Sequence, residues 1–323
     1  MKVIIPVAGE GTRLRPHTLT TPKTLLKVAG KPILGHILDQ LESLEISELI
    51  FITGPQREKI EEFVTSEYDI PARFVPQEQL HGLGYAVHLG LKEIDEEALI
   101  ILGDTIVEID WAGLIGGEKN ALAVQEVENP SAFGVVETNG DKITRLVEKP
   151  QHPPTNKAVV GVYYVRDYSM LLDATTEVVE NGIRTHGEIQ LTDAFELLLK
   201  KGAELYTFPT QAWYDCGRRE TILATNCYLL EKSSSGAERV TGEGITPPVN
   251  IGREVTIEGS EVGPHVSIGP GSIVRNSKLK NLIVGSNCLI EDSKLKDSLI
   301  GDNATIRGFS GDLSLGDYSE ITG

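Results

Sequence analysis

Short apolar runs alternate with amphipathic segments over the first two thirds of the chain. The runs KVIIPV from Lys2, ELIFIT around Ile50 and ALIILGD ending at Asp104 are typical of buried strands. Pro32 can begin a helix in which leucine and isoleucine recur at helical spacing, and the segment PQREKIEEFV predicts a second helix. Strands that alternate with helices predict a parallel sheet covered by helices, and such sheets bind ligands at the carboxyl ends of their strands.

The pattern becomes mixed in the next part of the chain. Two alternating stretches, GVVET and KITRLVE, flank Asn139–Gly140, a dipeptide that is a strong hairpin signal. A further strand pattern, VVGVYYV, precedes a helical pattern from Asp167, and a last helix is expected from about Arg219 to the linker-like segment EKSSSGAER. We therefore expect an α/β domain over residues 1–235, with a Rossmann-like, mixed and mainly parallel sheet flanked by helices.

Beyond about Ile245 the hydrophobic pattern takes a different period. Pairs of an aliphatic residue and glycine recur at Ile251–Gly252, Val262–Gly263, Ile268–Gly269, Val284–Gly285, Ile300–Gly301 and Leu315–Gly316. From Ile268 to Val284 to Ile300 the advance is sixteen residues each time. These steps are typical of the hexapeptide repeats of a β-helix, with about four coils of three short sides each. We expect the β-helix and its linker to occupy residues 236–323; a set of glycine-rich hairpins is the alternative.

Charge narrows the possible partners. The formal net charge is −17, which argues against nucleic acid as a general partner because phosphate backbones are bound by basic surfaces. The first 38 residues nevertheless contain six basic side chains and a single acidic one, Glu10, and this local positive charge indicates a small anionic ligand. No apolar run approaches the roughly 20 residues needed to span a bilayer, so no membrane partner is expected.

The cysteines and the N-terminal residues indicate the cellular location of the protein. Cys216, Cys227 and Cys288 are odd in number and lack CxxC spacing, so the sequence indicates neither a disulfide framework nor a zinc site. The apolar segment at the N-terminus is too short for a signal peptide and is followed by charged residues. We therefore expect reduced thiols in a cytoplasmic protein.

The glycine-containing segment VAGEGTRLRPHTLTTPK follows the first predicted strand. A Rossmann fingerprint would need glycine three places after Gly11, where Leu14 stands, and the prolines that follow prevent an immediate helix. A Walker A loop would need lysine and a hydroxyl residue directly after the second glycine, where Thr12–Arg13 stand instead. The two commonest nucleotide-binding loops are therefore not indicated.

The same segment can still bind phosphate. Gly9 and Gly11 leave backbone N–H groups unhindered for phosphate oxygens, and Arg13 supplies a delocalised fork of donors beside them. Lys23 lies ten residues beyond Arg13, past a proline-anchored excursion, and can return to the same anion as a point charge. A glycine turn with two solvated cations is the alternative.

The segment AGEGTRLRPHTLTTPKTLLKVAGKPIL closely resembles the signature of the sugar-1-phosphate nucleotidyltransferases, or NDP-sugar pyrophosphorylases, which reads GxGTRLxPxT, then PK, then KP. The match includes Thr12, Arg13, Lys23 and Lys31–Pro32 in order, and the resemblance extends into the C-terminal repeats, where it implies a left-handed β-helix. It implies an enzyme in which a sugar-1-phosphate oxygen attacks the α-phosphorus of a nucleoside triphosphate (NTP) and pyrophosphate leaves. Such a transfer depends mostly on positioning and charge neutralisation.

The resemblance also implies the residues of the nucleotide site. Arg13 and Lys23 are the catalytic cations, which neutralise charge at the α-phosphate and on the departing pyrophosphate. The nucleotide is contacted by Ala8, Gly9, Gly11, Thr12, Arg13, Gln77 and Gly82. The amide of Gln77 both donates and accepts, which suits the edge of uracil or thymine and favours UTP or dTTP. A polar loop residue is the alternative interpretation of Gln77.

Two aspartates match the metal ligands of that family. Asp104 follows the strand pattern ALIILG, and Asp215 lies in the segment AWYDCG. The resemblance implies that both bind Mg²⁺, which proteins often bind through one or two carboxylates together with phosphates. Thr105 stands where many relatives carry asparagine, which leaves the local contacts open. For Asp104 the alternative is a cap or turn residue.

Four further residues match positions that contact the sugar phosphate: Gly134, Glu148, Lys149 and Val159. Glu148 would accept hydrogen bonds from sugar hydroxyls, and Lys149 would bind the phosphate. Outside the family pattern, a Glu–Lys pair of this kind is usually a solvated surface pair. The implied acceptor is a hexose-1-phosphate, with glucose-1-phosphate the first candidate.

Two other functions are alternatives. One is a guanylyltransferase for mannose-1-phosphate, and the other is a non-catalytic regulatory subunit that binds sugar nucleotides. The presence of both Asp104 and Asp215 argues against the second. We do not expect the repeats to use His265 as an acyltransferase base, because no acetyl-CoA-binding extension is recognisable. We expect instead a homo-oligomer that associates through the β-helix, which exposes a broad face and an open end.

Overall fold

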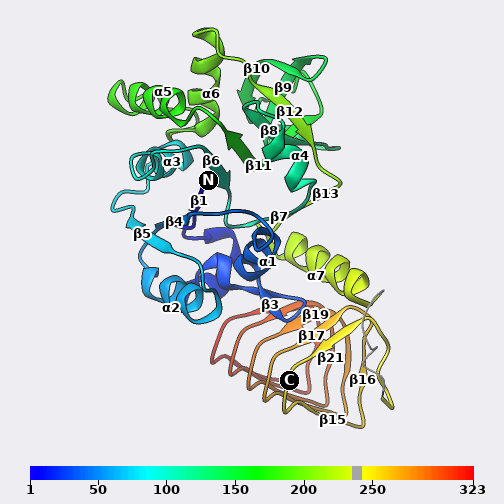
Figure 1. The fold of residues 1–323 in the computed structure, drawn as a ribbon. Coiled ribbons are helices and arrows are strands. Elements are labelled where there is room, and N and C mark those ends of the chain that lie inside the picture. The colour runs from blue at the N-terminus through cyan, green and yellow to red at the C-terminus, as the bar shows by residue number, and fades with distance from the viewer. Residues whose placement is uncertain (235–241) are drawn as a thin grey trace. The chain divides into compact units, whose positions relative to one another are not determined.

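The computed structural model of the protein describes residues 1–234 and 242–323 (Figure 1). The chain forms two compact units, one made of Met1–Gly9 and Ile37–Trp213 and the other of Glu10–His36 and Tyr214–Gly323. Over the described residues, no helix is both long and apolar enough to cross a membrane. The predicted domain boundary at residue 235 lies outside the described residues, so the division into residues 1–235 and 236–323 stays a prediction.

The first unit is built on a nine-stranded sheet with the order β5-β4-β1-β6-β11-β8-β12-β10-β9. Its strands are β1 (Lys2–Pro6), β4 (Glu48–Thr53), β5 (Ala72–Pro76), β6 (Ala98–Ile101), β8 (Ala121–Glu126), β9 (Gly134–Asn139), β10 (Lys142–Glu148), β11 (Lys157–Val165) and β12 (Tyr206–Pro209). The neighbours β5, β4, β1 and β6 are parallel, as the alternation of strand and helix patterns predicted. The three apolar runs form β1, β4 and β6, whose central residues Ile4, Ile50 and Ile100 are fully buried.

The other half of the sheet is mixed. Strand β11 runs antiparallel to both β6 and β8, and β12 runs parallel to β8. Strands β9 and β10 form the predicted antiparallel hairpin, with Gly140 at a φ of 66° in its turn. Because β11 opposes β6, its first residues extend past the carboxyl end of β6, where the N–H of Leu102 donates to the carbonyl oxygen of Gly161 at 2.9 Å.

Helices and short elements complete the first unit. The helices are α1 (Ile33–Leu41), α2 (Arg57–Glu67), α3 (Leu83–Leu91), α4 (Trp111–Gly116), α5 (Tyr168–Glu180) and α6 (Leu191–Lys200), with β7 (Thr105–Glu108) and the 3-10 turn η4 (Pro130–Ala132) between them. Helices α1 and α2 confirm the predicted pair, and α1 begins in the second unit. The core contains Val87 of α3, Leu171 of α5 and Phe195 of α6, all fully buried. These three helices therefore pack on one another through apolar side chains.

The second unit joins the segment Glu10–His36 to the later part of the chain. The segment contains the 3-10 turns η1 (Thr12–Leu14), η2 (His17–Leu19) and η3 (Lys23–Leu25) and the strands β2 (Lys27–Val28) and β3 (Lys31–Pro32). Strand β13 (Ala212–Asp215) ends in this unit, and α7 (Arg219–Ser234) starts where the sequence predicted a helix. Short 3-10 turns in place of a helix after Gly11 agree with the breaks expected from the prolines.

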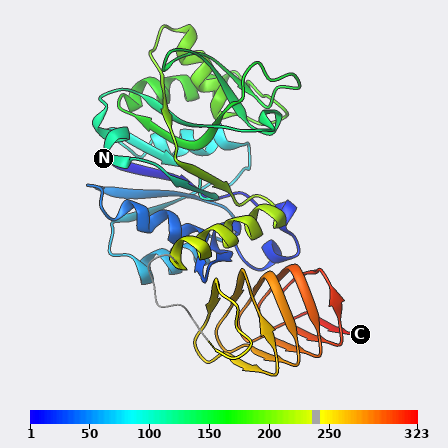
Figure 2. The ribbon, with the colours of Figure 1, turned by 90° about the vertical axis from the view of Figure 1, so that its right-hand side faces the viewer.

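The C-terminal residues form a β-helix with parallel strands on every side (Figure 2). One sheet has the path β14-β17-β19-β21-β23, which β16 and β24 join from the side, and the other has the order β15-β18-β20-β22-β25. The bounds are β14 (Val249–Ile251), β15 (Thr256–Glu258), β16 (Glu261–Val262), β17 (Val266–Ile268), β18 (Ile273–Arg275), β19 (Lys278–Val284), β20 (Leu289–Glu291), β21 (Lys294–Ile300), β22 (Thr305–Arg307), β23 (Ser310–Gly311), β24 (Ser314–Leu315) and β25 (Glu320–Thr322). Ile268 pairs with Val284, and Val284 pairs with Ile300, so the predicted sixteen-residue coil is confirmed.

Serine hydroxyls link successive coils inside the β-helix. The N–H of Ser277 donates to the hydroxyl of Ser260 at 3.0 Å, and the N–H of Ser293 donates to the hydroxyl of Ser277 at 3.0 Å. The N–H of Phe309 donates in turn to the hydroxyl of Ser293 at 3.2 Å. Each hydroxyl also donates to a carbonyl of its own coil. The buried serines are therefore satisfied, as buried polar groups in folded proteins are.

Lysines form two aligned pairs on the outside of the β-helix. Lys278 lies in register with Lys294, and Lys280 lies in register with Lys296, on the neighbouring strands β19 and β21. All four side chains are exposed, while the residues between them, Leu279 and Leu295, are buried. The period-2 alternation of these strands thus separates an apolar interior from a positively charged outer face.

Candidate active site

Three strands in the parallel part of the sheet place predicted site residues at one edge of it. Ala8 and Gly9 follow β1, Gln77 follows β5, and Asp104 follows β6. Hydrogen bonds extend the strands at this edge: Val7 N–H donates to Ile52 O at 2.8 Å, Gln77 N–H to Thr53 O at 2.8 Å, and Gly103 N–H to Pro6 O at 3.3 Å. The carboxyl edge of the sheet therefore gathers the residues predicted for part of the nucleotide site and for the metal.

The segment around Gly82 is fixed by a second loop. Gly82 has a φ of 107° and precedes α3, and a Cβ atom at this position would lie 2.6 Å from the carbonyl oxygen of Ile189. The N–H of Gly84 donates to that same oxygen at 2.9 Å, while Ile189 N–H donates to His81 O at 2.8 Å. Gln77, on the strand side, is only 6% exposed. The two residues predicted to contact the base thus lie in backbone that hydrogen bonds to neighbouring segments hold in place.

The residues predicted for the sugar phosphate come together in the first unit. Gly134 pairs with Glu148 in the β9–β10 hairpin, and β11, which carries Val159, pairs with β9 next to that point. A Cβ atom at Gly134 would lie 3.0 Å from Glu148 Oε2. Lys149 Nζ lies 3.0 Å from Glu148 Oε1, and the Glu148 side chain is only 10% exposed. The carboxylate of this pair is thus largely buried, whereas the Lys149 side chain is 44% exposed, and the roles of both residues stay predictions.

Thr192 is a member of this cluster that the sequence analysis missed. It lies in the first turn of α6, and its hydroxyl donates to Glu148 Oε2 at 3.0 Å. The carboxylate of Glu148 is therefore held on one oxygen by Thr192 and on the other by Lys149. No local signal marks Thr192, because the contact joins residues 44 positions apart in the chain.

Asp193, the next residue, is a second omission. Its Oδ1 accepts a hydrogen bond from the hydroxyl of Thr185 at 2.9 Å, whereas its Oδ2 is buried and has no hydrogen-bond partner among the described residues. Burial raises the pKa of Asp193, and the nearby charge of Glu148 raises it further. A buried carboxylate oxygen without a hydrogen-bond partner is uncommon in folded proteins.

Tyr163 on β11 lies near two of the predicted residues. Burial raises the pKa of its phenol, and the carboxylates of Glu148 and Asp104 raise it further. Its ring stacks on Phe195 of α6 with the centroids 5.4 Å apart. Glu148 and Asp104 thus both act on one buried hydroxyl, which places the sugar cluster and the end of β6 in the same region of the first unit.

In the second unit, the glycine-containing loop folds back on itself. Gly11 has a φ of 61°, and its carbonyl oxygen accepts a hydrogen bond from the hydroxyl of Thr18 at 2.9 Å. A Cβ atom at Gly11 would lie 3.1 Å from the Cβ of Lys23. The excursion from Arg15 to Pro22 therefore returns the chain, and Lys23 begins beside Gly11.

Arginines gather near the start of α7 in the same unit. Arg13, Arg218 and Arg219 line a cavity of about 400 Å³ together with Glu220 and Ser314. Asp215 ends β13, and a Cβ atom on Gly217 would lie 2.9 Å from its Oδ2. Of the sequence-predicted residues, Gly11, Thr12, Arg13, Lys23 and Asp215 belong to this unit. The other predicted residues belong to the first unit. The predicted site residues therefore form two groups, one in each unit, and their catalytic and metal-binding roles stay predictions.

The amino-acid sequence matches a known family over most of its length. The profile of the family described as nucleotidyl transferase matches residues 2–232. The bifunctional protein GlmU of Methanocaldococcus jannaschii is 36% identical over 263 residues, which are 80% of this chain and 60% of GlmU. The low-salt glycan biosynthesis nucleotidyltransferase Agl11 of Haloferax volcanii is 32% identical over 88% of this chain and 87% of its own. The UTP–glucose-1-phosphate uridylyltransferase AglF of the same organism is 31% identical over 74% of this chain and all of its own.

Comparison with solved structures also identifies proteins with a similar fold. A UDP-glucose pyrophosphorylase complexed with UDP-glucose aligns with a TM-score of 0.62 and 25% identity, over 72% of this chain and 98% of its own. A putative glucose-1-phosphate thymidylyltransferase from Bacillus anthracis aligns with a TM-score of 0.63 and 27% identity, over 71% of this chain and 94% of its own. The chain spans 60% of the length of GlmU, so GlmU has a further portion that this chain does not match.

Proposed function

Because the chain belongs to the nucleotidyl transferase family, we propose that it transfers a nucleotidyl group from UTP or dTTP to a hexose-1-phosphate and releases pyrophosphate. The observation that carries the proposal is the Glu148 carboxylate, which Thr192 and Lys149 flank at the edge of the first unit's sheet. A buried acceptor next to an ammonium group suits a ligand with hydroxyls at one end and phosphate at the other. Sugar-1-phosphates have this form.

The glycine-containing loop of the second unit supplies hydrogen-bond donors and positive charge for the phosphates. Backbone N–H groups around Gly11 can bind phosphate oxygens, and Lys23 starts beside that glycine. Arg13 is exposed beside two further arginines and can neutralise charge that develops on the departing pyrophosphate. We propose that Arg13 and Lys23 act in this way on the triphosphate, and that the lysine acts as a point charge at the reacting phosphate.

Magnesium is the cofactor that best fits the two aspartates matched to metal ligands, Asp104 and Asp215. Asp104 and Asp215 offer carboxylate oxygens, the ligands that Mg²⁺ prefers, and the negative charge of Asp104 raises the pKa of buried Tyr163. A cation bound by Asp104 would compensate that charge. We propose that Asp104 is a magnesium ligand, and we make the same proposal independently for Asp215. The bound ion would neutralise part of the triphosphate charge.

The choice of base and sugar rests on Gln77 and on the relatives. Gln77 is buried and its amide can donate and accept, as uracil and thymine do. One relative is named a UTP–glucose-1-phosphate uridylyltransferase, and two structural neighbours are named for UDP-glucose and for glucose-1-phosphate thymidylyl transfer. These points support glucose-1-phosphate as acceptor and a pyrimidine nucleotide as donor.

A substrate panel tests the proposal. The full chain would be mixed with Mg²⁺, each of the four NTPs and dTTP, and glucose-1-phosphate, mannose-1-phosphate or N-acetylglucosamine-1-phosphate, and pyrophosphate release would be measured. We expect release with UTP or dTTP and glucose-1-phosphate. A preference for GTP and mannose-1-phosphate would contradict the proposed specificity. Calorimetric binding of an NDP-sugar without turnover in any mixture would indicate a non-catalytic sensor instead.

Substitution of Asp104 separates the metal role from the fold. Asp104→Asn should lower turnover at least about 100-fold, because it removes a charge that acts in the transition state. Asp173→Asn is the matched control, since Asp173 is exposed on α5 and takes no part in the proposed site. Equal activity of the two variants would remove Asp104 from the metal site.

We also propose that the chain forms a homo-oligomer through its β-helix and acts in the cytoplasm. Tyr318 in the last coil is 79% exposed, and β25 is the last strand in the order of its sheet. Light scattering on the full chain should give a mass above that of one chain, and Tyr318→Glu should lower it. A monomeric mass at micromolar concentration would contradict the assembly. The cytoplasmic location rests on the number and spacing of the cysteines in the sequence, which indicate no disulfide framework.

A further inference from the structure

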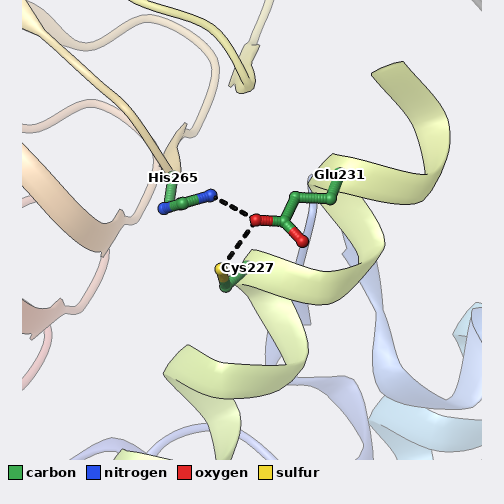
Figure 3. Close-up of side chains that lie close together, drawn as sticks. All are labelled: Cys227, Glu231 and His265. Atoms are coloured by element: carbon green, nitrogen blue, oxygen red, sulfur yellow. Dashed lines mark hydrogen bonds and ion pairs between the residues drawn. The ribbon is translucent and has the colours of Figure 1, made fainter. Parts of the chain in front are cut away.

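Cys227, Glu231 and His265 converge, and none of the three is assigned to the substrates or to magnesium (Figure 3). Their potential ligand atoms, one sulfur, one carboxylate oxygen and one imidazole nitrogen, all lie within 4.8 Å of one another. His265 Nε2 lies 2.9 Å from Glu231 Oε1, and Cys227 Sγ lies 3.7 Å from the same oxygen. All three residues belong to the second unit.

Two elements bring these side chains together. Cys227 and Glu231 are four residues apart on α7, so they project from the same face of the helix. His265 lies in the turn between β16 and β17, where its φ is 63°, an uncommon conformation for a residue with a side chain. The turn is therefore held in a defined shape by its surroundings.

Asn226 fixes that turn against the helix. Its side chain is fully buried, its amide nitrogen donates to the carbonyl oxygen of His265 at 3.4 Å, and its amide oxygen accepts from the hydroxyl of Ser267 at 2.6 Å. The N–H of Ala29 donates to the same amide oxygen at 2.8 Å. Since Asn226 precedes Cys227 in the chain, this network sets the position of His265 relative to the thiol. A preorganised set of ligands binds a metal with little further ordering.

The distances come close to those of a tetrahedral zinc site. Zinc bonds of about 2.0 Å to oxygen and nitrogen and 2.3 Å to sulfur place a ligand oxygen about 3.3 Å from a ligand nitrogen and about 3.5 Å from a ligand sulfur. The corresponding distances from Glu231 Oε1 are 2.9 and 3.7 Å, so shifts of a few tenths of an ångström are sufficient. The Glu231 side chain is 59% exposed, which leaves a path for the ion and a position for water as the fourth ligand.

We propose that Cys227, Glu231 and His265 bind one Zn²⁺ ion, which fastens α7 to the β16–β17 turn of the β-helix. A thiolate and an imidazole together favour zinc over magnesium or calcium, which prefer oxygen ligands only. Because the ion binds the folded arrangement and not the unfolded chain, it stabilises the second unit. The site is structural, and its test does not depend on the proposed transferase activity.

Metal binding to the full chain provides the first test. Chelator-treated protein would be titrated with ZnCl₂ in the presence of excess MgCl₂, and bound zinc would be counted by mass spectrometry of the metal. We expect one equivalent and a higher melting temperature. Co²⁺ in place of zinc should give the near-ultraviolet absorption of a cobalt–thiolate bond, which reports the cysteine directly. Absence of that absorption, or no bound zinc at micromolar concentration, would overturn the proposal.

Variants locate the site. Cys227→Ser should abolish the cobalt–thiolate absorption, and His265→Ala should weaken zinc binding at least 100-fold. His152→Ala is the matched histidine control, because His152 is exposed in the first unit. Circular dichroism of each metal-free variant would establish that it is folded. If Cys227→Ser keeps both the absorption and the zinc, the metal is bound elsewhere, for example near Cys216, and the assignment fails.

Discussion

The imidazole Nε2 of His17 lies 3.2 Å from the hydroxyl oxygen of Ser314, a residue 297 positions further along the chain. His17 is only 3% exposed, and this burial lowers the pKa of its imidazole to about 4, against a smaller opposite effect of Asp317. A neutral histidine thus joins the glycine-containing loop to a late coil of the β-helix. Protonation of the imidazole would put a charge into a site that excludes water.

The first prediction concerns pH. An unfolded histidine titrates near 6.5, so between about pH 6.5 and 4 the unfolded chain binds more protons than the folded one. The neutral His17 therefore makes its full contribution to the free energy of unfolding above about pH 6.5. That contribution is lost as the pH falls towards 4, and the free energy of unfolding should be about 2 kcal/mol lower at pH 5 than at neutral pH. His17→Asn, which keeps a polar group for Ser314, should lose less stability between pH 7.5 and 5 in urea titrations. Parallel curves for the two proteins would contradict the assignment.

The second prediction concerns Thr192. Thr192→Val removes the hydroxyl that donates to Glu148 Oε2 without changing the size of the side chain. A hydrogen bond to a charged group contributes about 1.5 to 3 kcal/mol, so the KM for the sugar-1-phosphate should rise about tenfold or more while the KM for the NTP stays unchanged. Thr144→Val, an exposed threonine on β10, is the control. Equal shifts of both constants would mean that Thr192 supports the whole fold instead.

The third prediction compares two glycines with nearly the same backbone conformation. Gly11 and Gly140 have φ values of 61° and 66°, but a Cβ atom would meet Thr18 Cγ2 at 2.9 Å at the first position and nothing within 4 Å at the second. Gly140→Ala should cost about 1 to 2 kcal/mol of unfolding free energy, from backbone strain alone. Gly11→Ala should cost more and should raise the KM for the NTP. Equal costs and unchanged kinetics would show that the loop can move to admit a methyl group.

The fourth prediction concerns the aligned lysines. Lys280 and Lys296 lie directly opposite each other on adjacent strands, where like charges are destabilising by a few tenths of a kcal/mol. Lys296→Gln should therefore raise the melting temperature slightly at low salt, and the gain should vanish in 1 M NaCl, where charges are screened within about 3 Å. Lys278→Gln is the contrasting variant, because Lys278 Nζ lies 2.5 Å from a Glu261 carboxylate oxygen. A gain that persists at high salt would exclude charge repulsion as the cause.

Local patterns in the sequence were sufficient for much of the fold. Buried strands such as β1 and β6, the hairpin at Gly140 and the sixteen-residue coil from Ile268 to Val284 all follow from short-range periodicity. Family membership was likewise predicted from the glycine-containing segment and is confirmed by the match over residues 2–232. Helix α3 was not predicted, because Gly82 and two glycines within the helix obscure its pattern.

Short-range patterns in the sequence do not predict contacts between residues that are far apart in the chain. Thr192 reaches Glu148 across 44 residues, and His265 reaches Glu231 across 34. The cysteine spacing gave no sign of a metal site, because only the folded β-helix turn brings a histidine to Cys227. The sequence predicted that Lys23 can return to the anion site of the loop, and the 3-10 turns between Gly11 and Lys23 explain how a segment with two prolines brings them together.

The serine ladder of the β-helix sets a rule for how this chain can change in length. Ser260, Ser277 and Ser293 each accept from the N–H sixteen or seventeen residues later, and the paired strands of successive coils advance by fifteen to seventeen residues. Loss or gain of one residue within a strand would turn lysines inward and leucines outward for the rest of that coil. Loss or gain of a whole coil would leave each remaining hydroxyl with a partner. Length variation among homologous β-helices should therefore occur in whole coils or at the corners, where Asn276, between β18 and β19, already adopts a φ of 46°.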